Sequence, residues 1–227
     1  IDISKLPELE QFMLHKISNL NSNFEKNFDI YNFHTIYKEL LNFCTVDLSA
    51  FYFDIRKDTL YCDELGSPKR KSTIIFLNIL IEILLKWFAP ILSFTAEEIY
   101  LLIKINTNKS IHIENFPKIP TKWANKNLYI KWTELIKIRE ICNSSIELKR
   151  AAKEIGSSLE ANLIINLNEK MIKFTEGIDF SELCITSDAK IEKSKSDEIV
   201  VKAIKAEGQK CPICWKITKG SCQRHSV

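Results

Sequence analysis

The chain has 227 residues, of which 45% are hydrophobic and 27% charged, and its formal net charge is +3 at pH 7. This composition is that of an ordinary soluble protein with one or two domains, not of a fibrous or disordered chain. Seven cysteines, an odd number, and the lack of a signal peptide favour a reducing compartment, so we expect a cytoplasmic protein. Because the chain starts at Ile1 and not at Met, we expect it to be a piece of a longer protein.

The positive charge is concentrated at one end of the chain. Residues 199–227 contain six lysines and arginines but one acid, Glu207, which gives a formal charge of +5, so the rest sums to −2. A compact positive module beside a nearly neutral body favours a polyanionic partner, and nucleic acid is the most common one. The alternative, a solvated lysine-rich tail, stays open at this point.

The first half of the chain predicts helices. Apolar residues recur every three or four positions from Leu6 to Leu20, which is the pattern of one helix face. Asp29 is a good N-cap for a second helix that continues to Cys44. The aromatic stretch 46–63 is harder to assign, and a turn is expected after it because Gly, Ser and Pro follow one another at 66–68.

Residues 72–89 form the most apolar segment of the chain. The interior polar residues of this segment are Asn78, Glu82 and Lys86, four apart, which predicts one polar stripe on a buried helix and an ion pair between Glu82 and Lys86. The segment is too short and too charged to span a membrane.

A further helix is expected after Pro90. Thr95–Glu98 fits a capping box, and Phe94 is placed to act with Ile99 as a hydrophobic staple. Together the helical segments predict an antiparallel bundle over residues 1–104.

A proline-containing connector, residues 105–130, is expected to follow the bundle. A long helix is predicted over 130–155, with Gly156 just after its end. The periodicity then changes and predicts short strands at 163–167, 171–174, 183–186 and 198–204. Residues 131–206 are therefore expected to be a long helix plus a small α/β subdomain, and the fold class is mainly α.

The last eighteen residues contain two closely spaced pairs of metal-ligand residues, Cys211 with Cys214 and Cys222 with His225. Thiolate sulfur and imidazole nitrogen are ligands that Zn²⁺ prefers, and four of them leave no open position for substrate. One structural zinc ion is therefore predicted in a module over 207–227, which would take folding energy from the metal. The alternative is a redox-active Cys211–Cys214 pair, which would have to follow a strand and open a helix.

No set of catalytic residues is found in the sequence. The four histidines lie beside no plausible nucleophile motif, and the five glycines form no phosphate-binding loop. Carboxylates are spread along helix faces as solvating charge. We therefore expect this chain to bind a partner and not to catalyse a reaction by itself.

Four stretches resemble the C-terminal region of bacterial isoleucyl-tRNA synthetases: residues 31–63, WFAPILSFTAEEIY at 87–100, residues 134–161, and the terminal KCPICW with CQRH. Together they span nearly the whole chain. The second stretch is shared with the valine, leucine and methionine enzymes, so the third and fourth in combination indicate isoleucine. The family pattern usually ends with a second C-x2-C pair, whereas His225 stands in the fourth ligand position here.

The resemblance implies that the bundle is of the class I synthetase anticodon-binding type. With the zinc module it would grip the anticodon stem-loop of isoleucine tRNA during ATP-dependent aminoacylation. ATP would bind in an N-terminal catalytic part that is absent from this chain, as is the editing part, and a monomer is expected. RNA loops are recognised by stacking bases on aromatic or Arg planes, with cations on phosphates. The residues predicted to bind tRNA are Trp215, Lys210, Lys216, Arg224, Arg56, Lys57 and Arg70.

Two other functions stay open. The first is the same region of a sister enzyme of the valine type, and the second is a non-enzymatic scaffold whose zinc knuckle binds protein. Two groups of predicted RNA contacts also have a purely structural alternative. Trp215 is equally compatible with a role in packing over the metal knuckle, and the basic residues 69–71 with a solvated loop.

Overall fold

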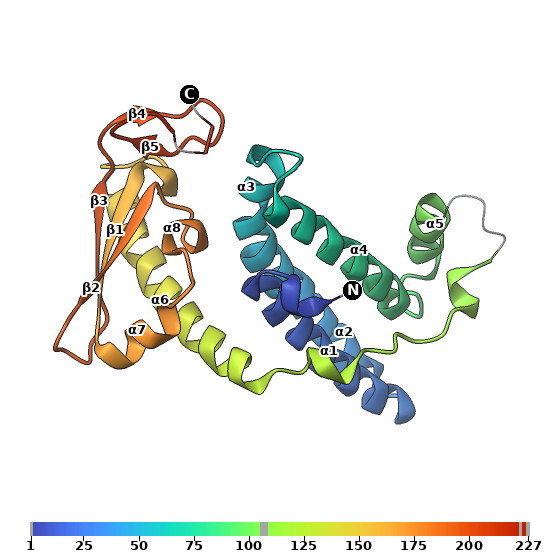
Figure 1. The fold of residues 1–227 in the computed structure, drawn as a ribbon. Helices are drawn as coiled ribbons and strands as arrows, with labels where there is room; N and C mark the ends of the chain where they lie inside the picture. Colours follow the sequence, from blue (N-terminus) through green and yellow to red (C-terminus); the bar gives the residue numbers. More distant parts are fainter. Residues whose placement is uncertain (1, 105–108, 223, 226–227) are drawn as a thin grey trace. The chain divides into compact units, whose positions relative to one another are not determined.

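The computed structural model describes residues 2–104, 109–222 and 224–225, and the chain divides into two compact units (Figure 1). The first unit comprises residues 1–60 and 64–125, and the second comprises residues 61–63 and 126–227. The boundary after Asn125 falls inside the predicted connector 105–130. The finer division at 206/207 stays a prediction.

The first unit is a helical bundle, as predicted. Its helices are α1 (Glu8–Asp29), α2 (Phe33–Asn42), α3 (Asp54–Cys62), α4 (Pro68–Phe88) and α5 (Ser93–Ile103). A π-helical segment, Phe43–Phe53, joins α2 to α3 without a break, so the aromatic stretch that was hard to assign is helical as far as Cys62. Short 3₁₀ turns lie at Ile3–Lys5, Ile111–Ile113 and Thr121–Trp123.

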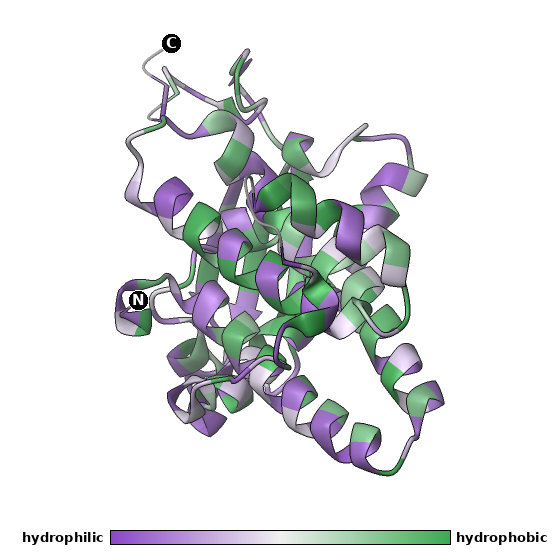
Figure 2. Cartoon of the chain, turned by 90° about the vertical axis from the view of Figure 1, so that its right-hand side faces the viewer, coloured by the Kyte–Doolittle hydropathy of each residue, from purple (hydrophilic) through white to green (hydrophobic). Residues whose placement is uncertain are grey.

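Aromatic side chains from several helices form the core of the bundle. Phe24 of α1 packs edge-on against Trp87 of α4, with ring centroids 5.0 Å apart. The ring centroid of Tyr52, in the π-helical segment, lies 4.7 Å from that of Phe76 in α4. The Trp87 indole N–H donates to Asn21 Oδ1 at 3.0 Å, so the one polar atom of this buried ring has a partner. Figure 2 shows hydrophobic and hydrophilic residues alternating along these helices, as amphipathic packing requires.

Two predictions for the bundle, the helix start at Asp29 and the ion pair between Glu82 and Lys86, are wrong. Asp29 ends α1 and does not begin α2. Glu82 pairs with Lys104 at 2.6 Å, whereas Lys86 lies 3.5 Å from Glu114, because α5 and the segment after it supply closer partners than the same helix.

The predicted capping box and hydrophobic staple of α5 are wrong. The helix begins at Ser93 with Leu92 at its N-cap, and Phe94 is 92% exposed. Glu97 instead accepts hydrogen bonds from the Ser110 hydroxyl and the Ile111 amide, both at 2.9 Å. The carboxylate therefore fixes the segment that follows α5 and does not cap its own helix.

The second unit packs a long helix, α6 (Lys126–Ala151), against a small sheet. The strands β1 (Ala161–Leu167), β2 (Asp188–Lys193) and β3 (Val200–Lys205) pair in the order β2-β1-β3. β1 runs parallel to β2 and antiparallel to β3. Ser145 of α6 ties the helix to β3, because its hydroxyl accepts from the Ala203 amide at 3.0 Å. The fold class, mainly helical with a small sheet, is confirmed.

Two of the four predicted strands are not strands: the first is helical, and the second is a helix end followed by a turn. Residues 171–174 lie in α7 (Glu169–Thr175), and 183–186 begin at the end of α8 (Phe180–Leu183). Side-chain caps explain both: Asn168 accepts from the Met171 amide, and Asp179 accepts from the Ser181 amide. The residue in the left-handed conformation after α6 is Lys153 (φ 57°), so Gly156 is not the residue that ends this helix.

A separate two-stranded sheet completes the second unit, with β4 (Gln209–Lys210) antiparallel to β5 (Ile217–Thr218). It anchors the C-terminal segment to the rest of the unit: the Ile217 amide donates to the Ser187 hydroxyl at 2.6 Å. Within the residues that the structure describes, no helix is both long enough and apolar enough to cross a membrane.

Candidate metal centre and nucleic-acid surface

The first ligand pair sits in the loop of the β4–β5 hairpin. Residues 211–216 connect the two strands, and the Cys211 amide donates to the Lys216 carbonyl at 2.9 Å. Within the loop, the Trp215 amide donates to the Cys211 carbonyl at 3.0 Å. This turn places the Cys211 and Cys214 side chains on the same side. The pair therefore leads into strand β5 and not into a helix, which removes the structural context that a redox pair requires.

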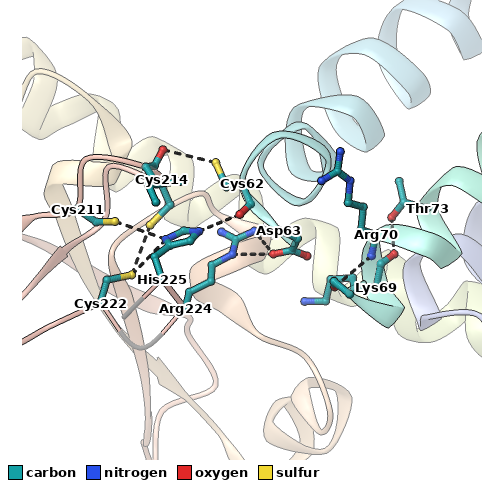
Figure 3. Close-up of polar contacts among 12 residues, drawn as sticks. Cys62, Asp63, Lys69, Arg70, Thr73, Cys211, Cys214, Cys222, Arg224 and His225 are labelled. Atoms are coloured by element: carbon teal, nitrogen blue, oxygen red, sulfur yellow. Dashed lines mark hydrogen bonds and ion pairs between the residues drawn. The ribbon is translucent and has the colours of Figure 1, made fainter. Parts of the chain in front are cut away.

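The four predicted metal ligands converge on one point (Figure 3). The ligand atoms of Cys211, Cys214, Cys222 and His225 all lie within 4.8 Å of one another. His225 Nδ1 lies 3.5 Å from both the Cys211 and the Cys222 sulfur, and the Cys214 and Cys222 sulfurs are 3.8 Å apart.

Three of these separations are close to the edges of a tetrahedral zinc site. With Zn–S bonds of about 2.3 Å and Zn–N bonds of about 2.05 Å, tetrahedral angles give S–S edges of about 3.8 Å and S–N edges of about 3.6 Å. The three distances above match those edges. A group of four soft donors with this spacing fits a Zn²⁺ ion, and the donor set leaves no ligand position for a substrate.

Main-chain amides stabilise two of the thiolates that such an ion needs. Burial would raise the pKa of Cys211, but the amides of Cys214 and Ile213 outweigh it and bring the pKa to about 6. Burial likewise opposes the amides of Arg224 and His225 at Cys222, whose pKa is lowered overall. By contrast, burial raises the pKa of Cys214 to about 11. Cys211 and Cys222 therefore lose their protons more readily than an ordinary cysteine, and Cys214 less readily.

The cluster has polar partners outside the ligand set, from residues 61–63 of the same unit. His225 Nε2 is 2.8 Å from the Cys62 carbonyl oxygen, and this hydrogen bond raises the pKa of the imidazole. The Arg224 guanidinium donates through Nε to Asp63 Oδ1 at 2.7 Å and through Nη2 to the same oxygen. No local pattern indicates a role for Cys62 and Asp63, because they are more than 160 residues from their partners.

The residues of the metal module that are predicted to contact RNA differ in exposure and in whether a protein group already binds them. Trp215 is 59% exposed and sits in the left-handed conformation (φ 63°), with Lys210 Nζ 5.3 Å from the centre of its ring. A ring this exposed does not cover the metal knuckle. Lys216 donates to the Ser181 hydroxyl at 2.9 Å, and the Arg224 guanidinium is committed to Asp63.

The prediction that Arg56 contacts RNA is contradicted by its position inside the bundle. Its side chain is 4% exposed and Glu10 is fully buried. Arg56 donates to both Glu10 oxygens, from Nε at 2.6 Å and from Nη2 at 2.8 Å, and the Tyr52 hydroxyl donates to Glu10 Oε1 at 3.0 Å. A buried guanidinium that gives two hydrogen bonds to a buried carboxylate is a structural cation, unavailable to a phosphate.

The other two predicted contacts of the first unit are more accessible. Lys57 is 55% exposed and pairs with Asp54 at 2.6 Å. Arg70 is half-buried in the first turn of α4, where its amide donates to the hydroxyl of the N-cap residue Ser67 at 3.4 Å (Figure 3). Lys69 and Lys71 beside it are exposed, so three cations follow one another at the start of this helix.

Known proteins are similar to this chain over its whole length. The family model for the anticodon-binding domain of tRNA ligase matches residues 10–165. The chain is 62% identical over 226 residues to the isoleucine–tRNA ligase of Pelagibacter ubique (strain HTCC1062), which covers 100% of this chain and 25% of that protein. It is 38% identical over 229 residues to the isoleucine–tRNA ligase of Agrobacterium fabrum (strain C58), which covers 96% of this chain and 24% of that protein.

The chain spans about a quarter of the length of the curated relatives that it matches. The matched residues 10–165 include most of the helical bundle and reach into the sheet of the second unit. The chain belongs to the family of anticodon-binding domains of tRNA ligases.

Proposed function

We propose that this chain is the tRNA-binding part of an isoleucine–tRNA ligase. The observation that carries the proposal is the family match over 10–165, together with relatives that bear the name isoleucine–tRNA ligase and align with this chain from end to end. In this proposal the chain grips the anticodon stem-loop of isoleucine tRNA. A separate N-terminal catalytic part uses ATP for aminoacylation in the cytoplasm, and the ligase acts as a monomer.

The C-terminal module holds one structural Zn²⁺ ion in this proposal. The ion would bind Cys211, Cys214, Cys222 and His225, and its bonds would supply cohesion to a segment with little apolar core. The support is the convergence of the four side chains, three of whose separations are close to the edges of a tetrahedral zinc site. The ion takes no part in chemistry, because protein side chains fill its four positions.

Trp215 is the residue that we propose to stack on an unpaired base. An exposed indole offers a face to any base, and such stacking is worth about 1–3 kcal/mol per base. Lys210, 5.3 Å from the ring centre, is placed to pair with a phosphate beside that base. Lys216 is a second, less exposed cation of the same loop.

A second group of cations supports an anionic partner. Lys69, Arg70 and Lys71 occupy the first turn of α4, where the helix macrodipole disfavours positive charge. A phosphate at this helix end would be attracted by both the cations and the dipole. Lys57 is an exposed cation of α3 that we also assign to phosphate contact, whereas Arg56 is no longer among the proposed contacts.

The test is binding of the 227-residue chain to isoleucine tRNA and to a copy with an altered anticodon, over a series of salt concentrations. We expect tighter binding to the intact anticodon and an affinity that falls steeply with salt, because phosphate contacts release counterions. Trp215→Ala should weaken binding about 5- to 150-fold, as loss of one stacked base predicts, while Trp215→Phe should keep most of the affinity.

The lysines give a matched pair of variants for the same assay. Lys210→Ala should lower the slope of log affinity against log salt by about one, because one phosphate contact is lost. Lys219→Ala removes an equally exposed charge from the same segment and should leave that slope nearly unchanged.

Two results would point to the alternatives. Tighter binding to valine tRNA than to isoleucine tRNA would assign the chain to a sister enzyme of the valine type. Failure to bind any tRNA, with metal bound, would support the protein-binding scaffold and refute the proposal.

A further inference from the structure

Residues 61–63 lie against the metal-ligand cluster although they come from the first third of the chain. Cys62 is partly buried and packs against Cys211, Cys214 and Cys222. Its thiol donates to the Ile213 carbonyl at 3.6 Å, between the first two ligands. The thiol of Cys62 is not one of the four converging ligand groups, so its position needs a different explanation.

The same residues hold the His225 end of the second ligand pair (Figure 3). The Cys62 carbonyl takes the hydrogen bond from His225 Nε2, which leaves Nδ1 to face the three sulfurs. Asp63 accepts both hydrogen bonds of the neighbouring Arg224, and the pair is shielded from solvent, with Asp63 13% and Arg224 27% exposed.

Among the residues that the structure describes, the second ligand pair lies outside any helix or strand. The first pair lies in a hairpin loop, but β5 ends at Thr218, before Cys222. Among the described residues after Thr218, the main-chain bond of the second pair is a turn from the His225 amide to the Cys222 carbonyl at 3.2 Å. The orientation of His225 therefore depends on the partner of its second nitrogen, as is general for histidine ligands.

We propose that Cys62 and Asp63 form a positioning clamp for the metal centre. The clamp consists of the Cys62 carbonyl on His225 and the Asp63 carboxylate on Arg224, and it sets the affinity for the ion. This inference rests on the metal site proposed above. It also gives Arg224 a role inside the protein, in place of the predicted contact with RNA.

The test is the zinc affinity of the 227-residue chain, measured by competition with a chromophoric chelator. Asp63→Ala should weaken zinc binding about 10-fold, at the lower end of what loss of an outer hydrogen bond costs. Arg224→Ala should weaken it by a similar factor, and the double variant should be no weaker than either single one, because both remove the same contact. Glu64→Ala removes an exposed carboxylate from the adjacent residue and should leave the affinity unchanged.

A second readout reports on His225 itself. Co²⁺ in the site should give an absorption spectrum typical of three thiolates and one imidazole, and Asp63→Ala should shift it toward the spectrum of His225→Ala. Exchange of the two charges, Asp63→Arg with Arg224→Asp, should restore most of the affinity and the spectrum. A change in overall stability alone would not produce this pattern.

Three results would overturn the clamp. Equal zinc affinities for Asp63→Ala, Glu64→Ala and the unmodified chain would refute it while leaving the metal site intact. If Cys62→Ala abolished metal binding and His225→Ala did not, Cys62 would be the fourth ligand. An unmodified chain that takes up no metal would refute both the clamp and the proposed metal site.

Discussion

The helical bundle and the C-terminal metal module differ in what they bury. The bundle removes large side chains from water, including Trp87, Tyr52 and Phe12, each at most 1% exposed. Full burial of one large apolar side chain is worth roughly 1.5–3 kcal/mol, so the bundle has a core of its own. Among the described residues after 206, the buried side chains are the three ligand thiols Cys211, Cys214 and Cys222.

The two regions of this chain are stabilised by two different mechanisms. Packing of apolar residues stabilises the bundle without a ligand. In the metal module the buried groups are the ligand side chains, which converge on one point. Burial of these thiols stabilises the fold little unless an ion binds them. The two regions should therefore respond to different perturbations.

Metal removal should have the largest effect and should act on one region. Structural zinc supplies roughly 10–16 kcal/mol in zinc-finger peptides, so a strong chelator, or Cys214→Ala, should unfold the C-terminal module. Most of the far-UV circular dichroism signal of the helices should remain, because the bundle keeps its core. Ser221→Ala, a change beside Cys222 that removes no ligand, should leave one metal per chain. Loss of all helical signal on chelation would contradict the comparison.

The converse perturbation is Glu10→Ala in the bundle. It leaves the Arg56 guanidinium buried without its carboxylate, and such a change costs about 3–5 kcal/mol. Chemical denaturation should report this loss, while zinc affinity at the C-terminal module should stay as it is. The control is Lys57, the residue next to Arg56, which forms an exposed ion pair with Asp54. Lys57→Ala should lower the free energy of unfolding by less than about 1 kcal/mol. If Glu10→Ala and Lys57→Ala lowered the free energy of unfolding equally, the buried ion pair would contribute no more to stability than the exposed one.

Features whose partners are close in sequence could be predicted from the sequence. The two ligand pairs, Cys211 with Cys214 and Cys222 with His225, depend on two-residue spacers, and the structure brings all four together. The helices of the bundle followed from local periodicity. The strand 163–167 is confirmed as part of β1.

Features that depend on distant partners could not be predicted. Arg56 stands in the charged run Arg-Lys-Asp, which looks like a solvated surface, but its partner Glu10 is 46 residues away. Cys62 and Asp63 meet the metal module across more than 160 residues. The wrong strand prediction at 171–174 has a different cause. Asn168 is a good N-cap residue three positions before Met171, so the sequence already favoured a helix there.

The smallest expected effect is a pH dependence that belongs to the bundle. The pKa of His15 is lowered, mainly by burial and also by Lys16, and its Nδ1 accepts a hydrogen bond from the Asn125 amide at 2.9 Å. Because the unfolded state binds a proton at His15 more readily, the bundle should lose stability as the pH falls below about 6.5 toward the lowered value. His15→Gln cannot take up this proton, so denaturation midpoints measured from pH 7.5 to 5 should fall less for this variant. Parallel pH profiles for the two proteins would show that other groups set the dependence.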